Sequence, residues 1–313
     1  MTTTTLVIAV GRPETCQQWA DVFKKLQPEW QVVCWDEVKD TVAADFAVVW
    51  RPSKQLFADQ PQLKAIFNIG AGVDGIDFSQ IPAELPVYRV EDAGMAVQMA
   101  EYAVYGALLA TQRFRPYAEQ QQKQQWQQAE PVYRHQWPVG VLGFGQIGQK
   151  VAQVMQSLGY PVSTWVRTPR SAPDGMQVYA GQEQLSEFLT QSRILINVLP
   201  LTAETQGIIN AQNLSQLPAD SFLINMARGG HVVDDDLVAA LDSGHLTGAL
   251  LDVFHTEPLP AEHVFWTHPQ VHITPHIAGV SLREPTVAQI QAKIKAFLQN
   301  QVVSGLVERD RMY

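Results

Sequence analysis

The chain is 313 residues long, carries a formal net charge of -9, and is 46% hydrophobic and 17% charged. This length exceeds one average domain, so we expect two domains with separate cores. The acidic balance argues against a nucleic acid or an anionic membrane as partner, because contacts to phosphate need a surplus of Lys and Arg. No apolar stretch approaches the ~20 residues that cross a bilayer. We therefore expect a soluble globular protein.

The N-terminal segment and the two cysteines bear on the compartment. The apolar stretch 6–10 lacks the basic flank and the length of a signal peptide, which favours a first strand. Cys16 and Cys34 have neither metal-ligand nor redox-motif spacing. We expect two reduced, apolar side chains, no metal site and a cytoplasmic location.

Short, β-branched apolar stretches recur along the chain and alternate with longer mixed segments that suit helices. The first series comprises 6–10, 31–35, 46–50, 65–69 and 87–90, and the second comprises 139–142, 162–166, 194–199, 222–226, 249–254 and 271–274. This order predicts an α/β fold with two doubly wound parallel-sheet domains, each sheet being covered on both faces.

Three further segments read as helices or polar tracts. Residues 98–113 and 284–299 predict two helices that could connect the domains. Residues 119–128 contain seven glutamines around Lys123 and Trp126. This tract favours a solvated helix or arm, and it is a subunit contact instead if Trp126 and Trp137 pack on a second copy.

The most specific local signal is a glycine-rich turn after the apolar stretch 139–142. It reads Gly143-Phe144-Gly145-Gln146-Ile147-Gly148, and apolar residues follow it at the spacing of one helix face. Strand, turn and helix together predict a dinucleotide site. Gly143 would permit the tight turn, Gly145 the approach of the pyrophosphate, and Gly148 the close packing of helix on strand. The helix N-terminus would face the anion.

The residues after the stretch 162–166 bear on which dinucleotide binds. A carboxylate there would bind the ribose 2′-hydroxyl and repel a 2′-phosphate. This chain has Arg167, Thr168 and Arg170 instead, with no acidic residue at the expected position. Arginine forms bidentate, charge-assisted bonds with phosphate, so we expect NADP(H) in preference to NAD(H), with NAD(H) as the alternative.

Ligands of open parallel sheets bind beyond the carboxyl ends of the strands. Pro200, Arg228, Asp252 and His276 are expected at such ends. Arg228 could hold the carboxylate of a 2-oxo acid, and His276 could exchange a proton with its carbonyl oxygen. Glu257 is the expected carboxylate that orients His276 and favours its protonated form.

With these residues in view, the chain resembles the D-isomer-specific 2-hydroxyacid dehydrogenases over nearly its full length, most closely their glyoxylate/hydroxypyruvate reductase A group. The likeness rests on Ala71-Gly72-Val73-Asp74, the dinucleotide turn, Asn225-Met226-Ala227-Arg228-Gly229, Leu251-Asp252-Val253-Phe254 with Glu257-Pro258, and Thr274-Pro275-His276. It implies hydride transfer from a nicotinamide to glyoxylate or hydroxypyruvate, with His276 as acid/base, Arg228 as carboxylate anchor and Glu257 in support.

The resemblance also implies a layout. A discontinuous, flavodoxin-like substrate domain would comprise residues 1–99 and 284–313, a Rossmann cofactor domain residues 100–283, with the active-site cleft between them and a homodimer as the assembly. The expected substrate-binding residues are Trp50, Ala71, Gly72, Val73, Arg228 and His276. The expected cofactor-binding residues are Gly143, Gly145, Gln146, Ile147, Gly148, Arg167, Thr168, Arg170, Leu199, Pro200, Ala227, Asp252 and Gly279.

Two other functions stay open at this point. One is an NAD-dependent dehydrogenase acting on another substrate, such as D-lactate or D-3-phosphoglycerate, and the other is a non-catalytic dinucleotide-sensing protein. The combination of Arg228, Glu257 and His276 disfavours the second. The sequence does not rank glyoxylate against hydroxypyruvate, because so small a difference in a pocket changes binding by only about 1–3 kcal/mol.

Overall fold

The structure is a computed structural model that describes residues 3–35, 42–112, 114–171 and 175–309. The chain forms two compact units. Unit 1 comprises Met1–Gly94 and Ser281–Tyr313, and unit 2 comprises Met95–Val280. Both chain ends therefore build unit 1. The boundaries predicted from the sequence, after residues 99 and 283, lie a few residues further along the chain.

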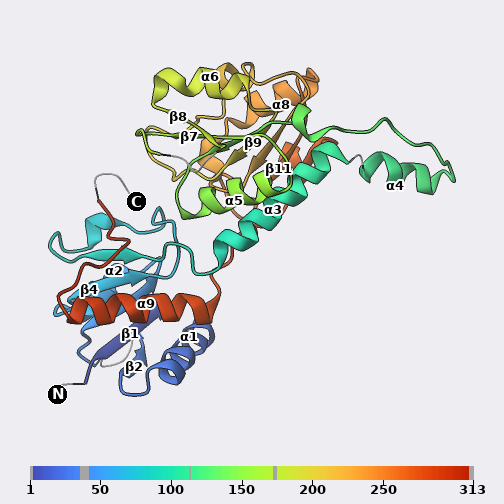
Figure 1. Cartoon of the computed structure of the whole chain (residues 1–313). Helices are drawn as coiled ribbons and strands as arrows, with labels where there is room; N and C mark the ends of the chain where they lie inside the picture. The colour runs from blue at the N-terminus through green and yellow to red at the C-terminus, as the bar shows by residue number, and fades with distance from the viewer. Residues whose placement is uncertain (1–2, 36–41, 113, 172–174, 310–313) are drawn as a thin grey trace. The chain divides into compact units, whose positions relative to one another are not determined.

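Unit 1 is a five-stranded parallel sheet with helices on both faces (Figure 1). Its strands are β1 (Thr5–Val10), β2 (Gln31–Cys34), β3 (Phe46–Trp50), β4 (Ala65–Asn68) and β5 (Val87–Arg89), in the order β2-β1-β3-β4-β5. Its helices are α1 (Pro13–Leu26), α2 (Lys54–Asp59) and α9 (Arg283–Leu298). The strand order is that of flavodoxin-like folds, which confirms the predicted class.

Alternating side chains explain why helices cover both faces of this sheet. Val49 of β3 and Ile66 of β4 pack in one cluster with Leu56 of α2. On the opposite face, Phe46 of β3 meets Phe297 of α9 with ring centroids 5.5 Å apart. The strand residues on both faces, Val49, Ile66 and Phe46, are buried, so the strands read as continuous apolar stretches in the sequence.

The two cysteines are paired, which corrects the expectation of two reduced thiols. Cys16 on α1 and Cys34 on β2 form a disulfide with their Cα atoms 6.0 Å apart. Because α1 packs against β2 in space, their separation along the chain gave no signal of this contact.

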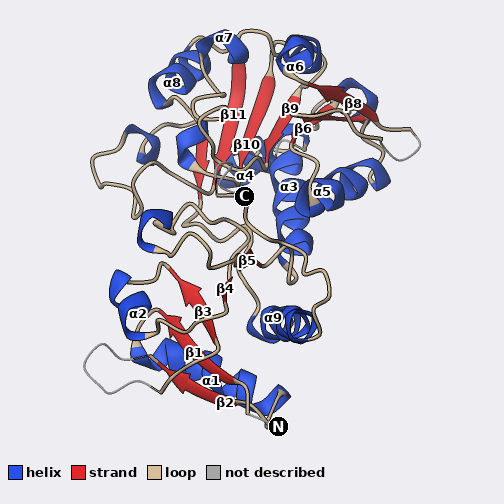
Figure 2. Cartoon of the chain, turned by 90° about the vertical axis from the view of Figure 1, so that its left-hand side faces the viewer, coloured by secondary structure: helices blue, strands red, loops and turns tan. Residues whose placement is uncertain are grey.

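Unit 2 is a seven-stranded parallel sheet (Figure 2). Its strands are β6 (Val139–Leu142), β7 (Val162–Val166), β8 (Gln177–Ala180), β9 (Ile194–Asn197), β10 (Ser221–Asn225), β11 (Leu246–Leu251) and β12 (Val271–Ile273), in the order β12-β11-β10-β9-β6-β7-β8. The order reverses between β6 and β9, as in Rossmann domains, which confirms the predicted fold. The edge strand β8 is half exposed and was not predicted.

Helices pack on the sheet of unit 2, and one extends away from it. The helices are α3 (Met95–Thr111), α4 (Phe114–Gln122), α5 (Gln146–Ser157), α6 (Leu185–Thr190), α7 (Ala211–Leu214) and α8 (Asp234–Asp242). The predicted end of the first connecting helix, Arg113, lies outside the described residues. A Cβ atom on Gly106 would lie 2.4 Å from Ile224 Cδ1, so glycine allows α3 to approach β10 closely. Figure 1 shows α4 and the chain after it extending from the body of unit 2.

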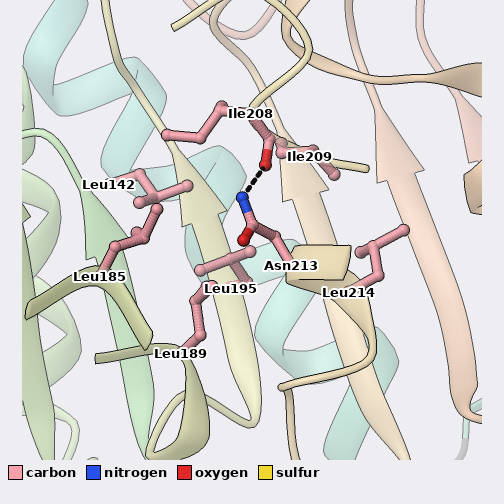
Figure 3. Close-up of a pocket in the computed structure, with 8 residues that line it drawn as sticks. All are labelled: Leu142, Leu185, Leu189, Leu195, Ile208, Ile209, Asn213 and Leu214. Carbon is pink, nitrogen blue, oxygen red and sulfur yellow. Dashed lines mark hydrogen bonds between the residues drawn. The ribbon is translucent and has the colours of Figure 1, made fainter. Parts of the chain in front are cut away.

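No helix among the described residues is long and apolar enough to span a membrane. The interior of unit 2 contains one small cavity of about 10 Å³, which Figure 3 shows in close-up. Seven of its lining residues are Leu or Ile, and the eighth, Asn213, donates from Nδ2 to the carbonyl of Ile208 at 2.7 Å. A void of this size and polarity holds no substrate.

Candidate active site

The predicted catalytic residues follow three neighbouring strands of unit 2. Arg228 follows β10, Glu257 lies in the loop after β11, and His276 follows β12. The strands β10, β11 and β12 are adjacent and parallel, so their carboxyl ends meet at one edge of the sheet. The fold thus assembles the three side chains where open α/β sheets bind ligands.

Glu257 and His276 form an ion pair. Glu257 Oε2 lies 2.7 Å from His276 Nδ1, and Glu257 Oε1 accepts a hydrogen bond from the backbone N–H of Phe254 at 3.1 Å. The side chains are 33% and 42% exposed, so the pair lies at a surface that a small molecule can reach. With Nδ1 bound to the carboxylate, Nε2 is the nitrogen through which His276 can exchange a proton with a ligand.

The backbone of His276 adopts the left-handed conformation, with φ at 55°. This conformation is costly for a residue other than glycine and persists only where the surroundings fix it. Asp252 provides that fixation, because its Oδ1 accepts from the N–H of Ile277 and its Oδ2 from that of Ala278, both at 2.8 Å. The N–H of His276 also donates to the carbonyl of Asp252 at 2.9 Å.

A chain of hydroxyl groups leads from α3 to Asp252. Thr274 Oγ1 donates to Asp252 Oδ1 at 2.6 Å, so the 2.6 Å contact between Tyr102 and Thr274 has the tyrosine hydroxyl as donor. Burial raises the pKa of Tyr102, and the charge of Asp252 raises it further. Tyr102 therefore stays protonated and keeps its role as donor. Asp252 itself is 1% exposed, and its carboxylate accepts from backbone and hydroxyl donors of the His276 loop.

The loop that carries Arg228 is fixed from two sides. Asn225 Nδ2 donates to the carbonyl of Arg228 at 3.0 Å, and His231 Nδ1 lies 3.1 Å from the same oxygen. A Cβ atom on Gly229 would lie 2.0 Å from the carbonyl carbon of Phe254. Glycine is therefore required here for the close approach of the β10 and β11 loops, rather than for a bend in the backbone.

The glycine-rich turn after β6 has the geometry of an anion cradle. Gly143 has φ at 104°, and a Cβ atom on Gly148 would lie 2.1 Å from the carbonyl oxygen of Gly143, so both positions need glycine. A Cβ atom on Gly145 would meet nothing within 4 Å, which leaves open space in front of the turn. Gly145 caps α5 without a side-chain hydrogen bond, so the first N–H groups of this helix suit a pyrophosphate.

The two arginines after β7 differ in how they are held. Arg170 Nη1 donates to the carbonyl of Phe144 in the glycine-rich turn at 2.6 Å, and its guanidinium lies over the Phe144 ring. Arg167 Nη1 lies 3.6 Å from Glu204 Oε2, and both of these side chains are exposed. Val166 occupies the end of β7 and is buried, so no carboxylate of this strand faces a ribose.

In unit 1, the predicted substrate residues lie at the ends of β3 and β4. Trp50 is 37% exposed and packs on Gly70, where a Cβ atom would lie 2.4 Å from Trp50 Cζ3. Arg51 follows in the left-handed conformation, with φ at 49°. Ala71 and Gly72 are half-buried, so their backbone is accessible to a ligand.

Comparison with known proteins identifies the family of this chain. The model for the NAD-binding domain of D-isomer-specific 2-hydroxyacid dehydrogenases matches residues 104–278. A dehydrogenase of that description from Xanthobacter autotrophicus Py2, in complex with NADPH and MES, is 33% identical, with a TM-score of 0.92 and 100% of both chains covered. This chain belongs to the D-isomer-specific 2-hydroxyacid dehydrogenases.

Two further structures are similar over almost the whole chain. A family member from Klebsiella pneumoniae 342 is 34% identical, with a TM-score of 0.86 and 98% and 99% of the two chains covered. An NADPH-dependent glyoxylate/hydroxypyruvate reductase from Sinorhizobium meliloti, in complex with NADP and sulfate, is 29% identical, with a TM-score of 0.91 and 99% and 100% covered. The family is one of oxidoreductases.

The other predicted cofactor residues of the present chain lie near the carboxyl ends of the strands of unit 2. Leu199 and Pro200 follow β9, Ala227 precedes Arg228, and the N–H of Leu199 donates to Asn197 Oδ1 at 3.1 Å. Gly279 packs on α3, where a Cβ atom would lie 2.8 Å from Met99 Cγ. This contact gives Gly279 a packing role independent of any cofactor.

Sequence reasoning missed several residues that fix the site. Tyr102, Asn197, Asn225, His231 and Thr274 hold its loops through side-chain hydrogen bonds, and three of them are completely buried. Asn197 and Asn225 each occupy the last position of a buried strand. A polar residue at that position, at the end of an apolar stretch, was the available signal.

Proposed function

We propose that this protein reduces small 2-oxo acids, such as glyoxylate and hydroxypyruvate, with NADPH as hydride donor. The observation that carries the proposal is the Glu257–His276 ion pair, with a 2.7 Å separation, which joins the loops after β11 and β12. The loop after β10, which carries Arg228, follows the strand adjacent to β11. A cation that binds a carboxylate beside a proton donor suits the reduction of a carbonyl next to a carboxylate.

Arg228 binds the substrate through its guanidinium in this proposal. The guanidinium can form two parallel bonds with a carboxylate, and its charge draws electron density toward the carbonyl oxygen. Asn225 and His231 hold the carbonyl of Arg228, so the backbone that carries this cation is fixed before substrate binds. A fixed cation loses little entropy on binding and lowers the barrier more than a mobile one does.

His276 supplies the proton. His276 Nε2 gives a proton to the carbonyl oxygen as the carbonyl carbon receives a hydride, so that C=O becomes CH–OH. NADPH, when bound, would supply that hydride. Glu257 stabilises the imidazolium before the transfer and keeps Nδ1 engaged, which leaves Nε2 as the donor. Asp252 maintains the left-handed backbone that directs the imidazole.

The choice of NADPH rests on the residues after β7. This segment offers two guanidinium groups and a hydroxyl, from Arg167, Arg170 and Thr168. Arg170 also donates a hydrogen bond to the carbonyl of Phe144. The positive charge of the arginines would attract the 2′-phosphate of NADPH. The ribose 2′-hydroxyl of NADH would have no carboxylate from this segment as its hydrogen-bond acceptor. The NADPH and NADP in the similar structures support the same choice.

An assay of turnover with both cofactors tests the proposal. Purified protein is mixed with NADPH or NADH and with glyoxylate, hydroxypyruvate or pyruvate, and the oxidation of the nicotinamide is followed by absorbance. We expect turnover of at least one 2-oxo acid and a higher kcat/KM with NADPH. NADPH binding without turnover would favour a dinucleotide-sensing protein, and a preference for NADH would contradict the cofactor assignment.

We also propose that the protein is a homodimer held by the arm formed by α4 and residues 123–133. The side chain of Trp126 is fully exposed, and Phe114 and Tyr133 are more than half exposed. Exposed aromatic residues gathered in one extended segment are typical of a surface covered by a partner. Analytical sedimentation of the wild type and of Trp126→Ser tests this proposal. We expect the wild type to be a dimer and the variant to have a higher dimer dissociation constant.

The cytoplasmic location stays a proposal that the two cysteines can test. A disulfide such as Cys16–Cys34 is unusual in a reducing compartment. Thiol titration of the protein isolated from its own cells under trapping conditions would show whether the two cysteines are paired there. Free thiols would support the cytoplasmic location, and a complete disulfide would argue against it.

A further inference from the structure

Two loops of unit 2 with different predicted ligands follow neighbouring strands. Leu199 and Pro200, predicted to bind the cofactor, follow β9, and Arg228, predicted to bind the substrate, follows β10. The two strands are paired in the sheet (Figure 2). The sheet thus places the loop for one ligand next to the loop for the other.

A pair of buried amides joins these loops. Asn197 and Asn225 are both 0% exposed, and Asn197 Nδ2 donates to Asn225 Oδ1 at 3.0 Å. Asn197 Oδ1 accepts from the N–H of Leu199 at 3.1 Å. At the other end, Asn225 Nδ2 donates to the carbonyl of Arg228 at 3.0 Å. Each amide uses both its oxygen and its nitrogen, so neither can turn over without losing bonds at both of its ends.

A buried histidine joins the same two loops. His231 is 0% exposed. Its Nδ1 lies 3.1 Å from the carbonyl oxygen of Arg228, and its Nε2 lies 3.2 Å from that of Pro200. Both partners are acceptors, so a neutral imidazole can donate to one of them and an imidazolium to both. The amide bridge and the histidine bridge close a ring of contacts through Leu199, Asn197, Asn225, Arg228, His231 and Pro200.

We propose that Asn197, Asn225 and His231 are positioning residues that couple the cofactor loop to the substrate loop. The inference rests on the proposed function, because it takes NADPH as the ligand of the first loop and the carboxylate of a 2-oxo acid as the ligand of Arg228. The shared buried bonds set the position of both loops and tie their remaining motion together. A ligand that orders one loop therefore reduces the entropy cost for the second ligand, so the two bind cooperatively.

The test measures how strongly one ligand favours the other. The dissociation constant of NADPH is determined by fluorescence without and with saturating oxamate, a non-reducible analogue of 2-oxo acids. The ratio of the two constants is the coupling factor, and by linkage it also describes how NADPH strengthens oxamate binding. Couplings between sites are typically about 5–150-fold, and we expect the wild type to lie in this range.

The decisive variant combines Asn197→Leu with His231→Phe, which keeps the approximate shape of both side chains and removes both bridges. The two carbonyls that His231 contacts each retain another donor, Asn225 Nδ2 at 3.0 Å and Thr205 Oγ1 at 2.7 Å, so neither becomes an unsatisfied buried acceptor. We expect the coupling factor to fall about fivefold or more. Any direct contact between NADPH and oxamate is the same in wild type and variant, so the decrease reports on the protein alone.

Thr205→Val is the matched control. It removes a bond of 2.7 Å to the carbonyl of Pro200, the oxygen that His231 also contacts, and leaves both bridges in place. We expect it to keep the coupling factor of the wild type. Amide hydrogen exchange adds a measurement that does not depend on oxamate. NADPH should slow the exchange of residues 227–231 in the wild type and in the control, but not in the double variant.

Three results overturn the inference: an unchanged coupling factor in the folded double variant, an equal loss of coupling in Thr205→Val, or a wild type that binds the two ligands independently. If the double variant does not fold, the two single variants are measured, and wild-type coupling in both overturns it. In each case the proposed function stands as long as the wild type turns over a 2-oxo acid. If the wild type neither turns over a 2-oxo acid nor binds oxamate, the proposed function fails as well.

Discussion

The buried polar residue near a strand end has opposite hydrogen-bonding roles in the two units. In unit 2, Asp252 accepts hydrogen bonds from the N–H groups of Ile277 and Ala278, so these donors face the protein interior. In unit 1, Asn68 donates to the carbonyls of Gly70 and Gly72, so acceptors face the interior and the next N–H groups face away. A buried acid and a buried amide thus orient two loops in opposite senses.

This difference shows how a shared architecture supplies different groups to a ligand. Both sheets are parallel and both loops follow a strand end. A carboxylate, however, accepts hydrogen bonds from backbone N–H groups, whereas an amide nitrogen donates hydrogen bonds to carbonyl oxygens. Unit 2 can then present an imidazole, a guanidinium and a helix N-terminus, which provide charge for chemistry. Unit 1 presents peptide N–H groups in the loop after β4, which in the proposed function would contribute to substrate binding. Variants in unit 2 should therefore affect kcat, and variants in unit 1 should affect KM or stability.

The largest expected effect is that of His276→Ala. Removal of the proton donor should lower kcat by about 10²–10⁴-fold, the usual contribution of general acid catalysis, and should leave NADPH affinity nearly unchanged. Steady-state kinetics and a fluorescence titration with NADPH measure the two quantities. A rate within a factor of a few of wild type would contradict the role assigned to His276 and, with it, the chemical character of unit 2.

Asp252→Asn should have the next largest effect. The amide nitrogen would face one of the N–H donors of Ile277 or Ala278, so the left-handed backbone of His276 would relax. A misplaced acid can reduce turnover about 10²-fold, so we expect a 10- to 100-fold lower kcat, with a lower melting temperature. Tyr102→Phe serves as a graded control, because it removes only the outer hydroxyl and leaves Thr274 bonded to Asp252. If Asp252→Asn and Tyr102→Phe had equal effects, the hydrogen bonds would not act in the order Tyr102, Thr274, Asp252.

Arg167→Ala should reduce the preference for NADPH over NADH about tenfold, because one charge-assisted bond to a 2′-phosphate is lost. Catalytic efficiency with NADH should stay near that of wild type. Glu204→Gln is the matched control, since it removes the partner of Arg167 in the exposed ion pair and leaves the guanidinium. An unchanged ratio of the two efficiencies in Arg167→Ala would assign phosphate binding to other residues.

The sequence predicted the architecture well, because apolar stretches and glycine spacing report on burial and backbone geometry. It identified both sheets and the glycine-rich turn, and it predicted Arg228 and His276 after strand ends, where the structure places them. It did not reveal β8, a short edge strand in which only two of four residues are buried. Nor did it reveal the disulfide, because Cys16 and Cys34 meet through tertiary packing.

The sequence also did not predict which residues orient the loops, because the available signal, a polar residue at the end of an apolar stretch, is not specific. Asn68, Asn225 and Asp252 each follow or end an apolar stretch, as many surface-loop residues do, and only the fold shows that they are buried. Asp252 was expected among the cofactor-binding residues, and its carboxylate accepts hydrogen bonds from donors of the His276 loop. A cofactor contact of Asp252 stays a prediction, and the positioning role is what the structure supports.

The smallest expected effect concerns a partly buried charge pair in unit 1, shortly after the end of β5. Glu91 accepts from Ser304 Oγ at 2.6 Å and from Lys293 Nζ at 3.1 Å, and Lys293 is only 5% exposed. Burial alone would raise the pKa of Glu91, but the bonds from Ser304 and Lys293 and the nearby positive charges hold it below the ordinary 4.5. The carboxylate therefore contributes stability above the unfolded pKa, and this contribution is lost as the pH falls through the folded pKa.

Glu91→Gln should consequently lower the free energy of unfolding by about 1 kcal/mol at neutral pH and by less in acid. Urea unfolding at neutral pH and below pH 4.5 measures this, and kcat of the folded variant should equal that of wild type. Parallel losses of stability on acidification in wild type and variant would show that Glu91 is not the titrating group. A change in kcat would mean that the charge of Glu91 influences the catalytic step. The assignment of binding to unit 1 and of catalysis to unit 2 would then be wrong.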